Sequence, residues 1–214
     1  MKTLNKRLSV EEFQKYVNEF NFGALNPNKL VIHHTWKPTK NDWKGESTLN
    51  GIKNYYEGKA WNAGPHLFIA EDGIWLFSPM NKKGIHSGVG NYRSIGIEVV
   101  GDYDVHKWSG KTKSNAISAI KILMTRLKIN TEMIKFHNDF SSKSCPGHAI
   151  TKEWLFNEIN FFNEEYKPPT WANDGVKFIK DNPVNKKPIM QIKNEQDARL
   201  ATILQRFYSL IKKK

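Results

Sequence analysis

The segment at residues 134–150, IKFHNDFSSKSCPGHAI, holds the only cysteine of this 214-residue chain, Cys145. His137 precedes this cysteine by eight residues and His148 follows it by three. Zinc prefers imidazole and thiolate ligands, and a catalytic zinc site keeps three protein ligands and leaves the fourth position to water. His137 stands at the end of an expected strand, and the polar loop up to Cys145 is long enough to double back. The segment therefore predicts two zinc ligands.

The third ligand has to come from another part of the chain. His33 is the leading candidate, near the end of the run LVIHH, which we expect to be a strand. Neighbouring residues on a strand point to opposite faces of the sheet, so His33 and His34 cannot both enter one site.

Two charged residues could complete a hydrolytic site. Glu98 stands inside SIGIEVVG, where a carboxylate is out of place unless it is paired, hydrogen-bonded or catalytic. Near a water activated by zinc, it would act as a general base and then pass the proton to a leaving amine. Lys143, two residues before Cys145, could stabilise a developing oxyanion. Together these residues predict metal-assisted hydrolysis of an amide or an ester.

Two other readings of the cysteine segment stay open. His148 could serve as a fourth ligand, which would close the metal site and make it structural. Cys145 could instead be a nucleophile paired with His137, but reactive thiolates are commonly activated at a helix N-terminus. The lysine and the proline around Cys145 suit a ligand loop better.

The surrounding sequence predicts an α/β domain that would hold these residues. Ser9 and Glu12 form a capping box, and apolar residues at helical spacing follow, so we expect a helix at 9–21. HLFIAEDGIWLFSP reads as a hairpin around the turn signal Glu-Asp-Gly. The other expected strands are KLVIHHTW, SIGIEVVG and MIKFH, and the other expected helices are TLNGIKNYYEGK, residues 114–128 and TKEWLFNEINFFNEE.

A break in this pattern predicts a separate C-terminal module. KPPT at 167–170 reads as a linker, so we expect a catalytic domain at 1–166 and a helical module at 171–214. The module carries ten Lys and Arg against four Asp and Glu. An apolar stripe at helical spacing favours a packing face within it: Leu200, Ile203, Leu204, Phe207 and Ile211.

The overall charge, 33 − 21 = +12, would attract polyanions such as nucleic acid, an acidic membrane surface or an anionic cell wall. We expect no nucleic-acid partner, because zinc-finger spacing, helix-turn-helix cues and the signature of an RNA-binding sheet are missing. No apolar run is long enough to span a bilayer. The start, MKTLNKRLSVEEFQKYV, lacks the apolar core of a secretory signal, so we expect synthesis in a cytoplasm.

Four segments in order carry a resemblance: VIHHTW, GPHLFIAEDG, GIHSGVGNYRSIGIEVVG and HNDFSSKSCPG. Over about residues 28–160 the chain resembles the zinc N-acetylmuramoyl-L-alanine amidases of the type 2 family, which includes phage amidases and peptidoglycan recognition proteins. The resemblance implies a mixed sheet flanked by helices, with one zinc in a surface groove that accepts peptidoglycan. By position it implies zinc ligands His33, His137 and Cys145, the catalytic residue Glu98 and the oxyanion lysine Lys143.

The resemblance also suggests substrate contacts. His86 and Asn91, in GIHSGVGN, resemble the part of the family that lines the sugar-peptide groove. His66 would line this groove or hydrogen-bond within the core, and Trp36 is a candidate for stacking on a sugar. One departure concerns the tyrosine that many phage amidases carry before the histidine of their G-x-H-F motif. Pro65 occupies that place, so the role of the tyrosine is absent or passes to Glu98.

The implied function is hydrolysis of the amide between N-acetylmuramic acid and L-alanine. A phage endolysin made in the host cytoplasm and acting on the wall fits best, with the basic tail binding anionic wall polymers or joining two subunits. The alternatives are a bacterial autolysin, an intracellular recycling amidase and a peptidoglycan-binding protein without turnover. Non-catalytic relatives typically lack the cysteine ligand, and this chain has Cys145.

Overall fold

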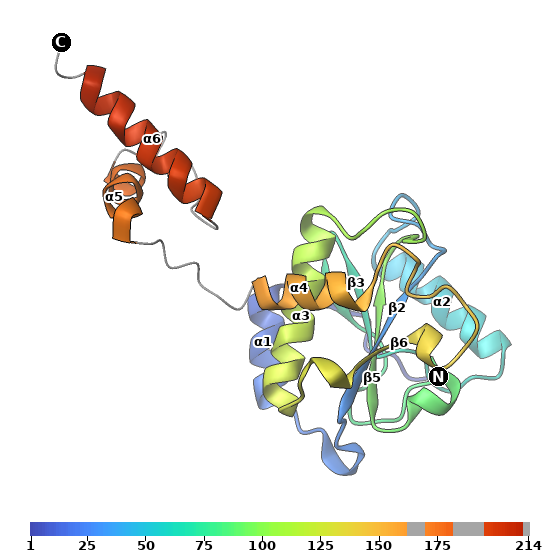
Figure 1. The fold of residues 1–214 in the computed structure, drawn as a ribbon. Coiled ribbons are helices and arrows are strands. Elements are labelled where there is room, and N and C mark those ends of the chain that lie inside the picture. Colours follow the sequence, from blue (N-terminus) through green and yellow to red (C-terminus); the bar gives the residue numbers. More distant parts are fainter. Residues whose placement is uncertain (162–169, 182–194, 212–214) are drawn as a thin grey trace. The chain divides into compact units, whose positions relative to one another are not determined.

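The computed structural model describes residues 1–161, 170–181 and 195–211 (Figure 1). The chain divides into two compact units, residues 1–159 and residues 160–214. The candidate zinc ligands and Glu98 all belong to the first unit. Among the described residues, no helix is both long and apolar enough to cross a membrane.

The first unit is built on a mixed six-stranded sheet with the order β1-β4-β3-β5-β2-β6. The pairs β3–β5, β5–β2 and β2–β6 are parallel, whereas the pairs β1–β4 and β4–β3 are antiparallel. The predicted α/β class with a mixed sheet is therefore confirmed. The strands are β1 (Lys6–Leu8), β2 (Lys29–His34), β3 (Leu67–Ala70), β4 (Gly73–Leu76), β5 (Ser94–Val99) and β6 (Ile134–Phe136).

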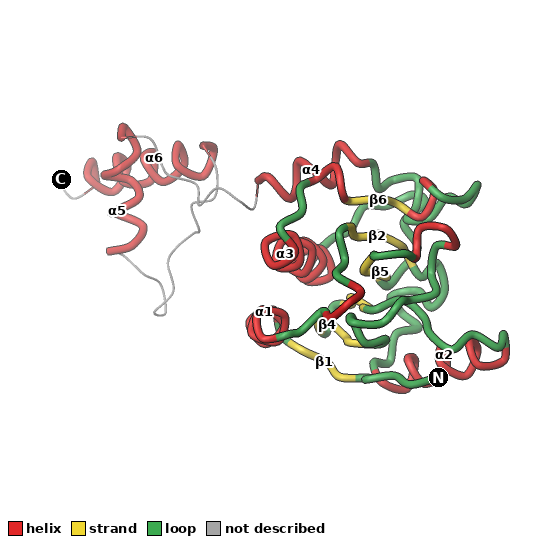
Figure 2. The backbone as a smooth tube through the Cα atoms, turned by 90° about the horizontal axis from the view of Figure 1, so that it is seen from below, coloured by secondary structure: helices red, strands yellow, loops and turns green. Residues whose placement is uncertain are grey.

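Helices cover both faces of the sheet, which explains why β2 and β5 are buried almost throughout. Helices α1 (Val10–Glu19), α3 (Gly110–Leu127) and α4 (Lys152–Phe161) lie on one face, and α2 (Glu46–Gly58) lies on the other (Figure 2). The larger core cluster packs under α1, α3 and α4, and a smaller cluster around Leu49 and Phe68 packs under α2.

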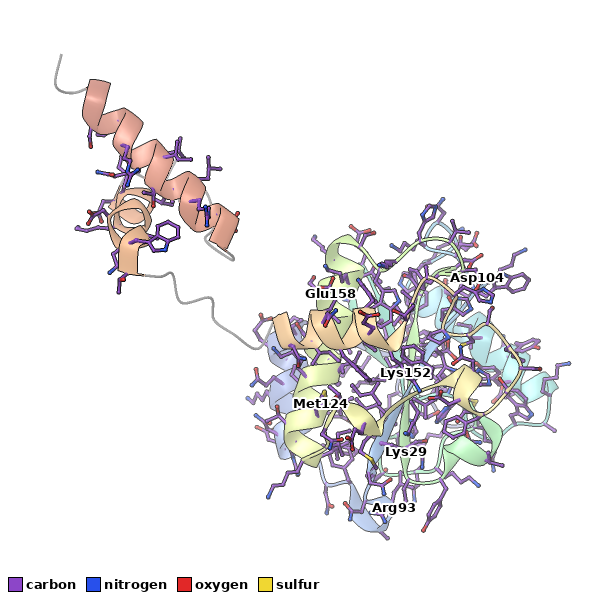
Figure 3. All side chains as sticks on the ribbon, in the orientation of Figure 1. Lys29, Arg93, Asp104, Met124, Lys152 and Glu158 are labelled. Carbon is purple, nitrogen blue, oxygen red and sulfur yellow. The ribbon has the colours of Figure 1, made fainter. Side chains whose placement is uncertain are left out.

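Local signals set the ends of these helices. The predicted capping box is present: Ser9 Oγ accepts from the Glu12 amide, and the Glu12 carboxylate accepts from the Ser9 amide. An ion pair of 3.0 Å joins Lys113 of α3 to Glu158 of α4, the residue labelled in Figure 3. The short edge strand β1 was not predicted.

The second unit contains α5 (Asn173–Asp181) and α6 (Glu195–Ile211), preceded by a 3-10 turn at Thr170–Ala172. The two helices approach closely at Gly175, where an added Cβ would lie 2.5 Å from the Thr202 amide nitrogen. A helical module was predicted. Most of the predicted linker, residues 167–169, and the expected domain end at Tyr166 lie outside the described residues.

The parallel part of the sheet gathers the chemistry-bearing residues at one edge. His33 and His34 end β2, Glu98 is the fifth of six residues in β5, and His137 directly follows β6. Since parallel neighbouring strands end at the same edge, these residues meet although they lie far apart in the sequence. Ligand sites of α/β sheets commonly form at this carboxyl edge.

Candidate metal centre

Three side chains converge at the carboxyl edge of the sheet. His33, His137 and Cys145 each present one ligand atom, and these atoms all lie within 4.8 Å of one another. Cys145 Sγ is 3.7 Å from His33 Nδ1, and the His33 and His137 rings have centroids 4.6 Å apart. Among the described residues, no other group of His, Cys, Asp or Glu side chains clusters in this way.

The loop between His137 and Cys145 doubles back as the sequence predicts. The chain makes one 3-10 turn at His137–Asp139, and the Asn138 amide then donates to the Cys145 carbonyl over 2.9 Å. Cys145 Sγ also accepts from the His34 amide at 3.4 Å, which fixes the sulfur against the end of β2. Two separate strands thus hold the three side chains in place.

The electrostatic state of the three groups suits a metal site. Burial above all lowers the pKa of His33 and of His137, so both imidazoles are neutral at pH 7 and keep a lone pair for a cation. Burial raises the pKa of the Cys145 thiol, so a metal would have to displace its proton on binding. Two imidazole nitrogens and one thiolate form a donor set that fits zinc.

Glu98 lies beside this cluster. Its Oε1 is 3.9 Å from His33 Nδ1, and its buried Oε2 has no hydrogen-bond partner among the residues that the structure describes. Burial raises the Glu98 pKa to about 8, although the positive charge of Lys143 opposes this shift. An unpartnered buried carboxylate oxygen is costly, which indicates that a ligand or water normally completes its surroundings.

The cluster opens into a groove of about 1040 Å³. Glu98 and Lys143 both line it, so the structure brings together the two residues that were predicted to be catalytic. Trp36, 56% exposed, stands on the wall as well. Helix α2 and the loop after it add an aromatic group, Tyr55, Tyr56 and Trp61, and the aliphatic Ile52 to the wall.

His148 does not belong to the cluster. Its side chain is exposed, and its Nδ1 lies 3.1 Å from Asp104 Oδ1. This pairing leaves the three-ligand group without a fourth protein ligand among the described residues, so the reading of a closed structural site is not supported. The open side of the cluster faces the groove.

Comparison with known proteins agrees with this geometry. Residues 23–148 match the family described as N-acetylmuramoyl-L-alanine amidase, which is more than half of the chain. The chain belongs to this amidase family.

Individual relatives are more distant. The amidase CwlA of Bacillus sp is 24% identical over 142 residues, which are 63% of this chain and 53% of CwlA. CwlH of Bacillus subtilis (strain 168) is 29% identical over 133 residues, 58% of this chain and 48% of CwlH. The chain thus spans about half the length of the curated relatives it matches.

Solved structures share the fold. The amidase LysC from Clostridium intestinale URNW superposes with a TM-score of 0.55 at 26% identity, covering 63% of this chain and 86% of LysC. Drosophila PGRP-LB superposes with a TM-score of 0.53 at 23% identity, covering 63% and 80%. At that identity the PGRP-LB match shows the fold alone.

Two of the candidate groove contacts lie in the core: His66, which takes the second of its two expected placements, and Asn91, which was expected in the groove. His66 is fully buried, its Nε2 lies 2.9 Å from the Lys82 carbonyl, and its Nδ1 accepts from the Gly96 amide at 2.9 Å. Both ring nitrogens are therefore used within the core. Asn91 is also buried, and its Oδ1 accepts from the amides of His86 and Ser87. Neither residue lines the groove.

His86 does line the groove, but its ring is engaged from both sides. Its Nδ1 lies 3.0 Å from His33 Nε2, and its Nε2 lies 3.2 Å from Ser94 Oγ. The sequence led us to expect a direct substrate contact, but both ring nitrogens of His86 already have partners within the protein. Burial lowers the His86 pKa well below its usual range, so this ring is neutral too.

Sequence reasoning missed Tyr56, which lines the groove near the position of the family tyrosine. Its ring packs over Gly64, next to Pro65, so closely that a Cβ at Gly64 would lie 2.6 Å from the ring. The signal was present, because Tyr56 follows Leu49 and Ile52 at helical spacing and therefore shares their sheet-facing side.

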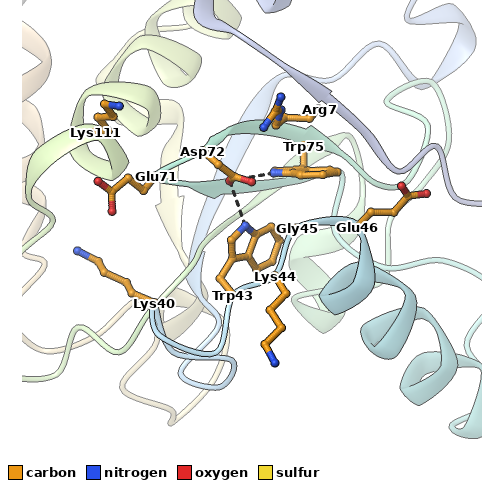
Figure 4. A pocket seen from close by; sticks show the side chains of 10 residues that line it. All are labelled: Arg7, Lys40, Trp43, Lys44, Gly45, Glu46, Glu71, Asp72, Trp75 and Lys111. Atoms are coloured by element: carbon orange, nitrogen blue, oxygen red, sulfur yellow. Dashed lines mark hydrogen bonds between the residues drawn. The ribbon is translucent and has the colours of Figure 1, made fainter.

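A second pocket, of about 630 Å³, lies at the turn between β3 and β4 (Figure 4). The indole nitrogens of Trp43 and Trp75 both donate to Asp72 Oδ1, at 3.0 Å and 3.1 Å. The pocket contains no histidine and no cysteine, and these indoles already occupy one oxygen of its central carboxylate. The groove around Glu98 is therefore the better candidate for the chemistry of this family.

Proposed function

We propose that this chain is a zinc-dependent amidase that hydrolyses the bond between N-acetylmuramic acid and L-alanine in peptidoglycan. The observation that carries the proposal is the meeting of His33, His137 and Cys145 beside Glu98 in one open groove. Membership of the amidase family and curated relatives named as amidases support it.

His33, His137 and Cys145 would hold the zinc. A zinc ion in such a site polarises a carbonyl and lowers the pKa of water. The chain contributes two neutral imidazoles, a thiol that gives up its proton on metal binding, and a groove that leaves one side of the cluster open to substrate. His33 at the end of β2, His137 after β6 and the loop that returns Cys145 to β2 keep the ligands pre-organised for this task.

Glu98 would move the proton. It would take a proton from the attacking water as the new C–O bond forms at the lactyl carbonyl of N-acetylmuramic acid. It would then give that proton to the alanine nitrogen as the C–N bond breaks. The products are a muramic acid carboxylate and a peptide with a free N-terminal alanine. A buried carboxyl group with a pKa of about 8 gains and releases a proton readily near neutral pH.

Lys143 would stabilise the negative charge that develops on the carbonyl oxygen. Its side chain is exposed on the groove wall, and its charge acts on Glu98, His33 and His137. A cation placed where charge develops stabilises the transition state more than the ground state. Lys143 also favours the ionised form of Glu98, the form that accepts a proton.

We propose a lytic role on the cell wall for the whole chain. One structural neighbour, LysCS from Clostridium intestinale URNW, is named an endolysin amidase and is 26% identical with a TM-score of 0.53. The C-terminal module, with ten basic residues against four acidic ones, would bind anionic wall polymers. In this proposal residues 1–166 form the catalytic domain and residues 171–214 the wall-binding module.

Digestion of purified cell walls tests the proposal. We expect turbidity to fall, and mass spectrometry to find fragments with new N-terminal alanine and no new reducing sugar ends. A chelator should stop the reaction and added zinc should restore it. Clearing that a chelator leaves unchanged would contradict the zinc mechanism. Binding to walls without any cleavage by the zinc-loaded protein would favour the alternative of a non-catalytic peptidoglycan-binding protein.

A further inference from the structure

A histidine outside the three-ligand group touches one of its members. His86, in the loop before β5, places its Nδ1 3.0 Å from His33 Nε2, and the two rings meet edge-on with centroids 5.1 Å apart. The opposite nitrogen of His33, Nδ1, is the one that faces Cys145 Sγ and Glu98. His86 thus contacts His33 at Nε2, the nitrogen that points away from the cluster.

The hydrogen bonds behind His86 fix which atoms carry the protons. Ser94 Oγ donates to the Asn91 carbonyl over 3.0 Å, because a carbonyl can only accept. With its proton used there, Ser94 Oγ accepts from His86 Nε2, which lies 3.2 Å away. A neutral His86 protonated on Nε2 has its lone pair on Nδ1. His33 must then donate from Nε2, which leaves the lone pair of His33 on Nδ1, facing the cluster.

We propose that His86 is a positioning residue, which sets the tautomer and the ring orientation of His33 so that Nδ1 is ready to bind the metal. The buried Ser94 hydroxyl and the Asn91 carbonyl set the direction of both hydrogen bonds, from His86 Nε2 to Ser94 and from His33 Nε2 to His86. Partners of this kind orient metal-binding histidines and raise their basicity.

The backbone around His86 is shaped to hold its ring. The His86 amide donates to Asn91 Oδ1 over 2.9 Å, which fixes the loop. A Cβ added at Gly96 would lie 2.6 Å from the His86 ring, and one added at Gly84 would lie 2.9 Å from it. Glycine at both positions therefore makes room for an imidazole. The segment GIHSGVGNYRSIG thus holds the His86 ring against His33, on the side of His33 that faces away from the cluster.

This assignment differs from a substrate contact in a checkable way. Both ring nitrogens of His86 have partners inside the protein, so neither is free to bond to a sugar or a peptide. Loss of His86 should therefore weaken metal binding first. A residue that only contacted substrate would change KM and leave metal affinity as it is.

The inference rests on the proposed zinc centre, but it can be tested in the metal-free protein. We expect ¹⁵N NMR of the imidazoles at neutral pH to show His33 and His86 both protonated on Nε2. A proton on His33 Nδ1 would overturn the assignment. The exposed His148 gives a reference signal for an imidazole at the surface.

Variants test the consequence for metal binding. In competition with a chelator, His86→Ala should bind zinc roughly 10- to 100-fold more weakly than wild type. His86→Gln should recover part of the loss, because its amide oxygen can accept from His33, and Ser94→Ala should show a smaller loss while folding normally. The exposed His106→Ala is the matched control and should bind zinc like wild type.

The outcomes separate the two proposals. Unchanged zinc affinity in folded His86→Ala and Ser94→Ala, with normal affinity in wild type, would overturn the role of His86 and leave the amidase proposal standing. Wild-type protein that binds no zinc would instead overturn the metal centre.

Discussion

His33 and Glu98 are direct register partners on the parallel strands β2 and β5, and His33 Nδ1 lies 3.9 Å from Glu98 Oε1. Side chains of register partners project from the same face of a sheet. One backbone pairing therefore places a candidate zinc ligand and the candidate proton carrier side by side. The pairing of the two strands therefore sets their separation.

Replacing Glu98 should separate metal binding from turnover. Glu98→Gln is expected to bind zinc like wild type but to lose roughly 100-fold or more in kcat, because a positioned general acid–base contributes about 10²–10⁴. Metal analysis checks zinc binding, and the rate at which N-terminal alanine is released checks kcat. The exposed Glu132→Gln is the control. A fully active Glu98→Gln would show that another group moves the proton.

The raised pKa of Glu98 also predicts how stability depends on pH in the metal-free protein. The folded carboxyl holds its proton up to about pH 8, whereas the unfolded one releases it near 4.5. Between these values the unfolded state binds fewer protons, so this group lowers the free energy of unfolding as pH rises from 4.5 to 8.

Urea unfolding of metal-free protein at several pH values measures this effect. Glu98→Gln removes the titrating group, so it should gain stability relative to wild type as pH rises through that window. A difference between the two proteins that stays constant from pH 4.5 to pH 8 would mean that Glu98 titrates normally.

Lys143 should matter for catalysis and not for metal binding. Lys143→Ala is expected to lower kcat roughly 100-fold, in line with the loss of one oxyanion-stabilising group, and to leave zinc affinity nearly unchanged. Steady-state kinetics on a soluble muramyl peptide provides the measurement, with the exposed Lys83→Ala as the control. Equal kcat values in the two variants would remove Lys143 from the mechanism.

The C-terminal module should affect wall binding more than chemistry. A chain ending at Phe161 keeps the metal cluster and all of α4. We expect it to hydrolyse soluble muramyl peptides like the full chain but to sediment less with purified walls, most clearly at low salt. If wall binding stays unchanged and the full chain alone is dimeric, the module joins subunits instead.

The sequence predicted the strands of the site well, for identifiable reasons. β2 and β5 are buried on both faces, so they appear as short apolar runs, and a histidine or glutamate inside such a run stands out. His137 and Cys145 could be paired because a short polar loop joins them. The edge strand Lys6–Leu8 was missed because three residues carry no detectable alternation.

The supporting contacts could not be read from spacing alone. Whether His86 faces substrate or His33 depends on the fold of the loop before β5, which Asn91 and two glycines determine by tertiary contacts. The burial of His66 likewise depends on the Lys82 carbonyl, sixteen residues away in the chain. Such partners lie in other segments of the chain, so no local sequence pattern predicts them.

X-ray absorption spectroscopy of the zinc-loaded protein tests the central claim most directly. The account predicts one sulfur at about 2.3 Å, two imidazole nitrogens at about 2.0–2.1 Å and one further light atom from solvent. Cys145→Ser should lose the sulfur signal. A zinc shell without sulfur in wild type, or one filled by four protein ligands, would contradict the proposed hydrolytic centre.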